Sequence, residues 1–262
     1  MLFAQGKRPT RAAILDFVAR QQSVLLSHDP AGEAGVELAV ANGEPSPLGR
    51  RSAGAQDEVW LELLRDGLTF DLRGLAPGPC PGVPPITHRF DFAPGGGEDA
   101  SEDALEALAV LPGPHLAGGE RSMPVLKAML GLARDLTQHF PDLVAIHWAP
   151  SHSAIGRRFF ESVITAWLDG GAFPALGLTA FEEASDGALQ SVGLGLWIGQ
   201  EVRIEPPLTN DKIAATRLGV RLINQLVIVG GLDESERIIA PDGTRLVMQT
   251  SRNSQFIRIR RE

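Results

Sequence analysis

Residues 142–168 read DLVAIHWAPSHSAIGRRFFESVITAWL, and this stretch decides the fold class that the sequence predicts. It opens with the apolar run Leu143-Val144-Ala145-Ile146, which is typical of a short strand covered on both faces. Further on, large apolar side chains recur with the spacing of one helix face at Phe160, Val163, Ile164 and Trp167. The stretch therefore predicts a strand, a Ser/His loop and an amphipathic helix over residues 154–168.

The flanks of this helix carry start and stop signals. Either Ser151 or Ser153 is a candidate cap, because a serine oxygen can accept from the free N–H groups of a first helical turn. Gly170-Gly171 predicts the end of the helix. Beyond it, we expect a strand over residues 174–181 and a hairpin over residues 192–205 that turns at Gly199-Gln200.

The rest of the chain supplies two more helices and further hairpins. Apolar periodicity predicts helices over residues 122–140 and 209–229. Asp66-Gly67 between two alternating runs predicts a type I′ hairpin, with Thr69 and Asp71 on a wet face. The last strand, residues 256–260, alternates apolar residues with arginines, which suits the edge of a sheet. The predicted fold class is α+β, with a mainly antiparallel or mixed sheet and three principal helices.

The chain organisation follows from composition. Residues 93–103 contain three consecutive glycines and an acidic run, so they are the candidate linker. Residues 1–92 form a strand-rich N-terminal part, and residues 104–262 form the main α+β part. The two parts can also fold together as a single domain.

Charge and cysteine content restrict the partners and the compartment. The formal net charge of −8 disfavours nucleic acid and anionic membranes, which attract basic surfaces. No uncharged apolar run approaches the ~18 residues of a membrane span. With Cys80 as the single cysteine and no signal peptide in the sequence, we expect a cytoplasmic protein.

Standard catalytic and cofactor motifs are absent from the sequence. It contains no Walker phosphate loop, zinc helix, calcium loop or nucleophile elbow. The glycines at 193, 195 and 199 do not have the spacing of a dinucleotide fingerprint. We therefore expect no cofactor and no metal, since a pair formed by His147 and His152 does not define a metal site.

One group of reactive side chains remains, in residues 147–161. It follows the carboxyl end of a predicted strand, where ligands often bind in α/β folds. Candidate ligands of an anion are Ser151, His152, Ser153 and Arg157, near a helix start whose free N–H groups favour negative charge. Candidate acid–base residues are His147, His152 and Glu161, with Glu182 and Glu183 as further carboxylates. The alternative is structural: the serines cap the helix and the arginines lie in water.

Three segments resemble an uncharacterised bacterial family known as a domain of unknown function. They are residues 145–151 (AIHWAPS), 173–178 (FPALGL) and 193–201 (GLGLWIGQE), within a span of about residues 120–229. The resemblance implies a bacterial protein, as does the preference for arginine over lysine. It implies no activity, ligand or catalytic residue.

Two functions follow as hypotheses. The first is a soluble, non-enzymatic binding or accessory protein that acts on a protein partner or a small anionic ligand. It is favoured because the standard catalytic signatures are missing. The second is a metal-independent hydrolase or transferase that acts on a small anionic substrate through residues 147–161. A pocket that holds His147, His152 and Glu161 together would favour the enzyme.

Overall fold

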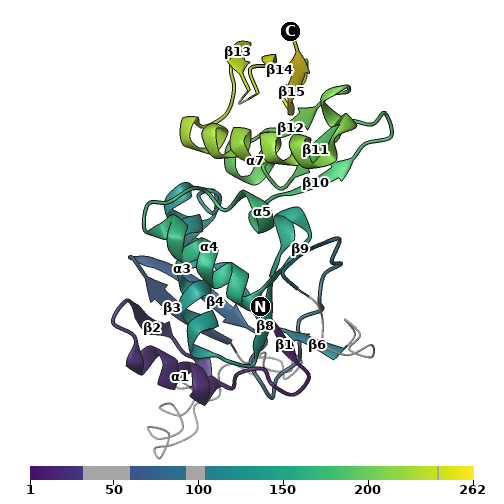
Figure 1. Ribbon diagram of the computed structural model, residues 1–262. Coiled ribbons are helices and arrows are strands. Elements are labelled where there is room, and N and C mark those ends of the chain that lie inside the picture. The colour runs from purple at the N-terminus through teal and green to yellow at the C-terminus, as the bar shows by residue number, and fades with distance from the viewer. Residues whose placement is uncertain (32–59, 93–103, 241) are drawn as a thin grey trace, which may run out of the picture. The chain divides into compact units, whose positions relative to one another are not determined.

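The computed structural model describes the chain except for residues 32–59, 93–103 and 241 (Figure 1). The candidate linker, residues 93–103, therefore lies outside the described residues. Within them, six α-helices combine with three sheets that are mostly antiparallel, so the predicted α+β class is confirmed, with more helices than the three expected. None of these helices is long and apolar enough to cross a membrane.

The chain divides into two compact units. Unit 1 comprises Met1–Val83, Pro94–Glu120 and Pro124–Val144. Unit 2 comprises Pro84–Ala93, Arg121–Met123 and Ala145–Glu262. Each unit has its own sheet and its own buried side chains, and each is described by itself.

Unit 1 is built on a four-stranded antiparallel sheet with the order β2-β3-β4-β7. These strands are β2 (Val24–His28), β3 (Trp60–Arg65), β4 (Leu68–Arg73) and β7 (Ala109–Pro112). The remaining elements are β1 (Leu2–Ala4), which pairs with β6 (Leu105–Ala107), and the helices α1 (Arg11–Arg20) and α3 (Met123–His139).

The hairpin of unit 1 confirms the turn prediction. Arg65 lies opposite Leu68, and Asp66 and Gly67 both have positive φ values, 51° and 77°, as a type I′ turn requires. The wet face predicted for β4 is wrong, because Thr69 and Asp71 are buried. The Oγ1 atom of Thr69 lies 3.2 Å from Nδ1 of His115, and Asp71 accepts from its neighbour Arg73.

The first elements of unit 2 surround the Ser/His loop. Strand β9 (Ser153–Gly156) pairs antiparallel with β8 (Leu143–Trp148) and parallel with β5 (His88–Phe90). Because residues 153–156 belong to this strand, α4 (Arg157–Leu168) begins three residues later than expected. The capping prediction is also wrong, since Gly156 occupies the N-cap position and no side chain caps the helix.

The next segment differs most from expectation. Residues 174–181 form a short, kinked α5 (Ala175–Leu178) and then β10 (Ala180–Glu183), instead of one strand. Residues 192–198 were expected as a strand, but β11 (Leu189–Val192) ends there and α6 (Gly195–Ile198) follows. Gly199 then leads into β12 (Glu201–Ile204) with a φ of 75°.

The main sheet of unit 2 has six strands in the order β10-β11-β12-β15-β14-β13 (Figure 1). The C-terminal strands are β13 (Glu236–Ile239), β14 (Arg245–Thr250) and β15 (Phe256–Arg261). Strand β15 was expected at an edge, but it lies inside the sheet, parallel to β12 and antiparallel to β14. Its apolar side chains Ile257 and Ile259 are fully buried, which an interior position explains.

Helix α7 (Lys212–Val229) covers part of this sheet. It starts at Lys212 instead of residue 209, because Asp211 caps it by accepting from the backbone N–H of Ala214 at 3.0 Å. Gly230 ends it in the left-handed conformation, as the glycine pair predicted. Among the strands, the helix packs chiefly against β11 and β12, and it also packs against α5; its buried side chains include Leu222, Ile223 and Leu226.

Candidate functional site

His147 occupies the end of β8, where the sequence placed a candidate acid–base residue. Its side chain is half-buried, and Nε2 lies 3.4 Å from the carbonyl oxygen of Pro85. Burial lowers the pKa of His147 below its ordinary value of 6.5, although the contact with Pro85 acts in the opposite direction. The charge of the nearby His152 lowers the pKa further.

The two serines of the loop point into the protein. Ser151 and Ser153 are fully buried, and their hydroxyl oxygens lie 2.7 Å apart. The hydroxyl of Ser151 also donates to the carbonyl oxygen of Gly177 at 3.0 Å. These contacts give both side chains a structural role, which is to join the loop to α5.

His152, Arg157 and Glu161 are distributed around the loop and the helix. The side chain of His152 is exposed on a left-handed residue, and its carbonyl oxygen accepts from the N–H of His88 at 3.1 Å. Arg157 and Glu161 lie one turn apart on α4 and are partly exposed. The start of α4 is closely covered, since a Cβ atom at Gly156 would lie 1.8 Å from the carbonyl oxygen of Asp91.

The two further carboxylates considered with this group have other partners. Glu182 lies 3.1 Å from Nε2 of His88, and Glu183 accepts from Nζ of Lys212 at 2.6 Å. The structure therefore brings His147 near His152, and Ser151 against Ser153. It places Glu182 against His88 and pairs Glu183 with Lys212.

Sequence reasoning missed an aromatic cluster beside this loop. Trp197 of α6 stacks on Trp148, with ring centroids 6.0 Å apart, and meets Trp167 and Phe173 nearly edge-on at 5.8 Å and 4.9 Å. Trp197 is distant in sequence from the other three residues, and the bend of the chain at α6 places it beside them.

The carboxylate of Glu201 holds this bend. Its Oε1 accepts from the backbone N–H groups of Gly193 at 3.0 Å and Gly195 at 2.8 Å. Its Oε2 accepts from the N–H of Leu194 at 3.2 Å and the hydroxyl of Ser191 at 2.5 Å. Burial raises the pKa of Glu201 above its usual range, while the four donors favour the charged form. Glu201 is therefore a structural carboxylate whose hydrogen bonds are all internal.

A groove of about 470 Å³ lies between α7 and the hairpin of β13 and β14. Helix α7 contributes the larger share of its walls, through Ala214, Ala215, Arg217, Leu218 and Arg221. The hairpin contributes Ala240, Asp242, Thr244 and Leu246, and Leu208 lies near the start of the helix. Small and apolar side chains dominate, so the groove has an apolar floor and a few polar groups at its rim.

The charged groups at the rim differ in whether they make hydrogen bonds within the chain. Arg217 and Arg221 are exposed, and neither makes a hydrogen bond or ion pair to another residue in the described part of the chain. Asp242 is engaged in the hairpin turn, where Oδ1 accepts from the backbone N–H of Thr244 at 2.9 Å. That hydrogen bond holds the pKa of Asp242 below its ordinary range, so the carboxylate stays charged.

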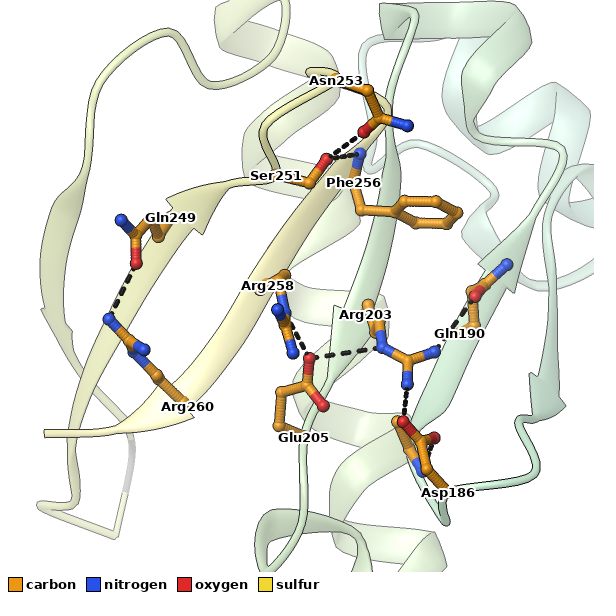
Figure 2. A network of polar contacts seen from close by, with 11 residues as sticks. Asp186, Gln190, Arg203, Glu205, Gln249, Ser251, Asn253, Phe256, Arg258 and Arg260 are labelled. Carbon is orange, nitrogen blue, oxygen red and sulfur yellow. Dashed lines mark hydrogen bonds and ion pairs between the residues drawn. The ribbon is translucent and has the colours of Figure 1, made fainter.

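The opposite face of the same sheet carries a polar network in place of a groove. Figure 2 shows Arg203, Glu205 and Arg258 close together on this face. Oε1 of Glu205 accepts from Nε of Arg203 at 3.3 Å and from Nε of Arg258 at 2.6 Å. Arg203 also pairs with Asp186, while Arg260 donates to Gln249 at 2.7 Å. These arginines are mostly paired within the chain, unlike the two at the groove.

In the residues that the structure describes, no group of three or more histidine, cysteine, aspartate or glutamate side chains could hold a metal ion. Comparisons with protein families, with curated proteins and with solved structures found no match to this chain. The groove beside α7 in unit 2 is therefore the best candidate site.

Proposed function

We propose that this chain is a non-enzymatic binding protein and that it binds its ligand in the groove between α7 and the β13–β14 hairpin. The observation that carries the proposal is the groove itself, with about 470 Å³ of space over an apolar floor. Sites for small molecules commonly measure about 300–1,000 Å³, are mostly apolar and contain a few polar groups that orient the ligand.

The dimensions of the sheet explain why the groove exists. A helix with its side chains is about 10–12 Å across, and neighbouring strands lie about 4.8 Å apart. One helix therefore covers two or three strands, whereas this sheet has six. Helix α7 packs chiefly on β11 and β12, so the face of β14 continues past it. The corner between the helix and this part of the sheet is the groove.

The enzyme hypothesis receives less support from the loop. Ser151 and Ser153 are buried and bonded to each other, and His152 is exposed on the other side of the turn. His147 is directed to the carbonyl oxygen of Pro85. An active site would need these side chains to converge on one substrate, but the serines are buried while His152 is exposed, and His147 contacts the Pro85 carbonyl oxygen.

The proposal can be tested by filling the groove. Ala214 is an exposed helical residue that lines it, so Ala214→Trp should occupy the space that the ligand needs. A matched control is Ile213→Trp, because Ile213 is also exposed but does not line the groove. Both substitutions add a large aromatic side chain to the first turn of α7.

The measurement is binding of the neutral fluorescent dye Nile red to the folded chain. We expect saturable binding in the parent and in Ile213→Trp, and at least a tenfold weaker affinity in Ala214→Trp. Circular dichroism of each variant verifies that the helix is retained. Equal affinities in the two variants, or no saturable binding in the parent, would contradict the proposal.

A further inference from the structure

The rim of the groove contains a pair of arginines with a geometry suited to one anionic group. Arg217 and Arg221 are four residues apart on α7, so they lie one above the other on the same side of the helix. Side chains at this spacing have Cβ atoms about 6 Å apart. Two guanidinium groups starting from such neighbouring positions can reach a single head group between them.

These arginines also lack the carboxylate partners that Arg203 and Arg258 of the sheet have. On the opposite face, Arg203 and Arg258 share Glu205. At the groove, no hydrogen bond or ion pair satisfies Arg217 or Arg221 within the residues that the structure describes. Two adjacent, uncompensated positive charges repel each other, and a bound anion would relieve this repulsion.

The remaining charged groups near the groove leave the arginines available. Asp242 lies on the hairpin side, and its carboxylate accepts from the N–H of Thr244 within its own turn. Arg261 is close enough to Asp242 to contribute to its electrostatic environment. The negative charge of Asp242 is therefore partly offset on the hairpin side, while α7 presents net positive charge.

We infer that the ligand is an amphiphilic anion, with a carboxylate or phosphate monoester head held by Arg217 and Arg221 and an apolar chain lying along Leu218 and Leu246. This inference rests on the proposed function. The planar fork of a guanidinium matches both head groups, because each offers two oxygens to parallel N–H donors. The apolar chain gains from removal of its surface from water against the floor of the groove.

The test is isothermal titration calorimetry with three ligands of one chain length: decanoate, decyl phosphate and the neutral decanamide, all below their aggregation concentrations. The variant is Arg217→Gln/Arg221→Gln, which leaves a shorter, neutral polar side chain at each position and removes two charges. The control is Arg158→Gln/Arg252→Gln, which removes two charges from exposed positions outside the groove.

We expect decanoate or decyl phosphate to bind the parent at least tenfold more tightly than decanamide. The Arg217→Gln/Arg221→Gln variant should lose that preference and retain decanamide binding, and the control variant should keep the preference. The anion with the larger loss identifies the head group, carboxylate or phosphate. Increasing salt should weaken anion binding in the parent but not decanamide binding.

Failure of this inference can be distinguished from failure of the proposed function. If decanamide binds as tightly as the anions, or if both arginine variants behave alike, the head-group assignment is wrong while the groove remains a binding site. If Ala214→Trp leaves the binding of every ligand unchanged, the groove is not the site and both proposals fail.

Discussion

Replacing Glu201 by alanine should destabilise unit 2 through the loop that this carboxylate organises. In the parent, Glu201 accepts from the N–H groups of Gly193, Leu194 and Gly195 and from the hydroxyl of Ser191. Alanine removes all four acceptor contacts while the donors stay in place. The bend that carries α6 would then contain unpaired donors.

The magnitude follows from the burial of those donors. Ser191, Gly193 and Leu194 are buried, whereas Gly195 is partly exposed and can turn to water. A buried donor without an acceptor costs about 1–3 kcal/mol. Water that enters the vacated space repays part of this, so three donors at the lower value give a loss of about 3 kcal/mol. Glu201→Gln keeps Oε1 for Gly193 and should lose only about 1 kcal/mol, because one N–H then faces an amide donor.

Urea unfolding monitored by tryptophan fluorescence measures these losses, since α6 carries Trp197. The midpoint should fall in the order parent, Glu201→Gln, Glu201→Ala, with an unchanged slope. Glu183→Ala is the control, because Glu183 makes an exposed ion pair with Lys212 that is worth at most about 1 kcal/mol. Equal losses for Glu201→Ala and Glu183→Ala would show that the four contacts of Glu201 do not stabilise the bend.

Three further outcomes test the packing and the titration of unit 2. Gly156→Ala should lower the free energy of unfolding by more than about 3 kcal/mol, because its Cβ atom would lie 1.8 Å from the Asp91 carbonyl oxygen. The control Gly82→Ala should change the stability little, because the space around Gly82 is open. Trp167→Ala removes a buried ring from the aromatic cluster and should cost about 3–5 kcal/mol, so a melting temperature within error of the parent would show that this packing is wrong. His147 has a lowered pKa in the folded state, so the unfolded chain binds more protons below pH ~6.5 and stability falls as the pH falls. His147→Gln should reduce the loss of stability between pH 7.5 and 5.5. If the loss is unchanged, the burial of His147 is not its cause.

Local signals were sufficient where one short segment determines its own conformation. Asp66-Gly67 predicted the hairpin, because both residues must take positive φ and these residue types tolerate it. Gly230 predicted the end of α7 for the same reason. The apolar stripes identified α3, α4 and α7 to within three residues at each end.

Long-range contacts determine the conformation of the segments for which the local sequence pattern predicted the wrong structure. Residues 192–196 alternate glycine with larger apolar residues, and Ile198 continues the apolar face, which favours a strand by periodicity alone. The observed bend depends on the carboxylate of Glu201, whose acceptor role no local pattern reveals. In the same way, either Ser151 or Ser153 was expected to cap a helix, but Ser151 lies in the turn before β9 and pairing with β5 and β8 places Ser153 in that strand.

The groove beside α7 could not be predicted from the sequence, for a similar reason. The sequence shows Arg217 and Arg221 at a helical spacing, which by itself is typical of a solvated face. Their interest comes from the groove next to them, which exists because the sheet continues past α7. That extension results from the parallel pairing of β12 with β15, whose strands are separated by some fifty residues of chain. No local signal predicts such a pairing.

Chemical-shift mapping of the folded chain shows whether the groove beside α7 is the ligand site. Amide spectra of the ¹⁵N-labelled chain would be recorded during titration with decanoate. We expect saturable shifts concentrated at groove residues such as Ala215, Leu218 and Leu246, with residues 147–161 unaffected. Shifts concentrated at His147, at His152 and along the start of α4, with none at the groove, would contradict it.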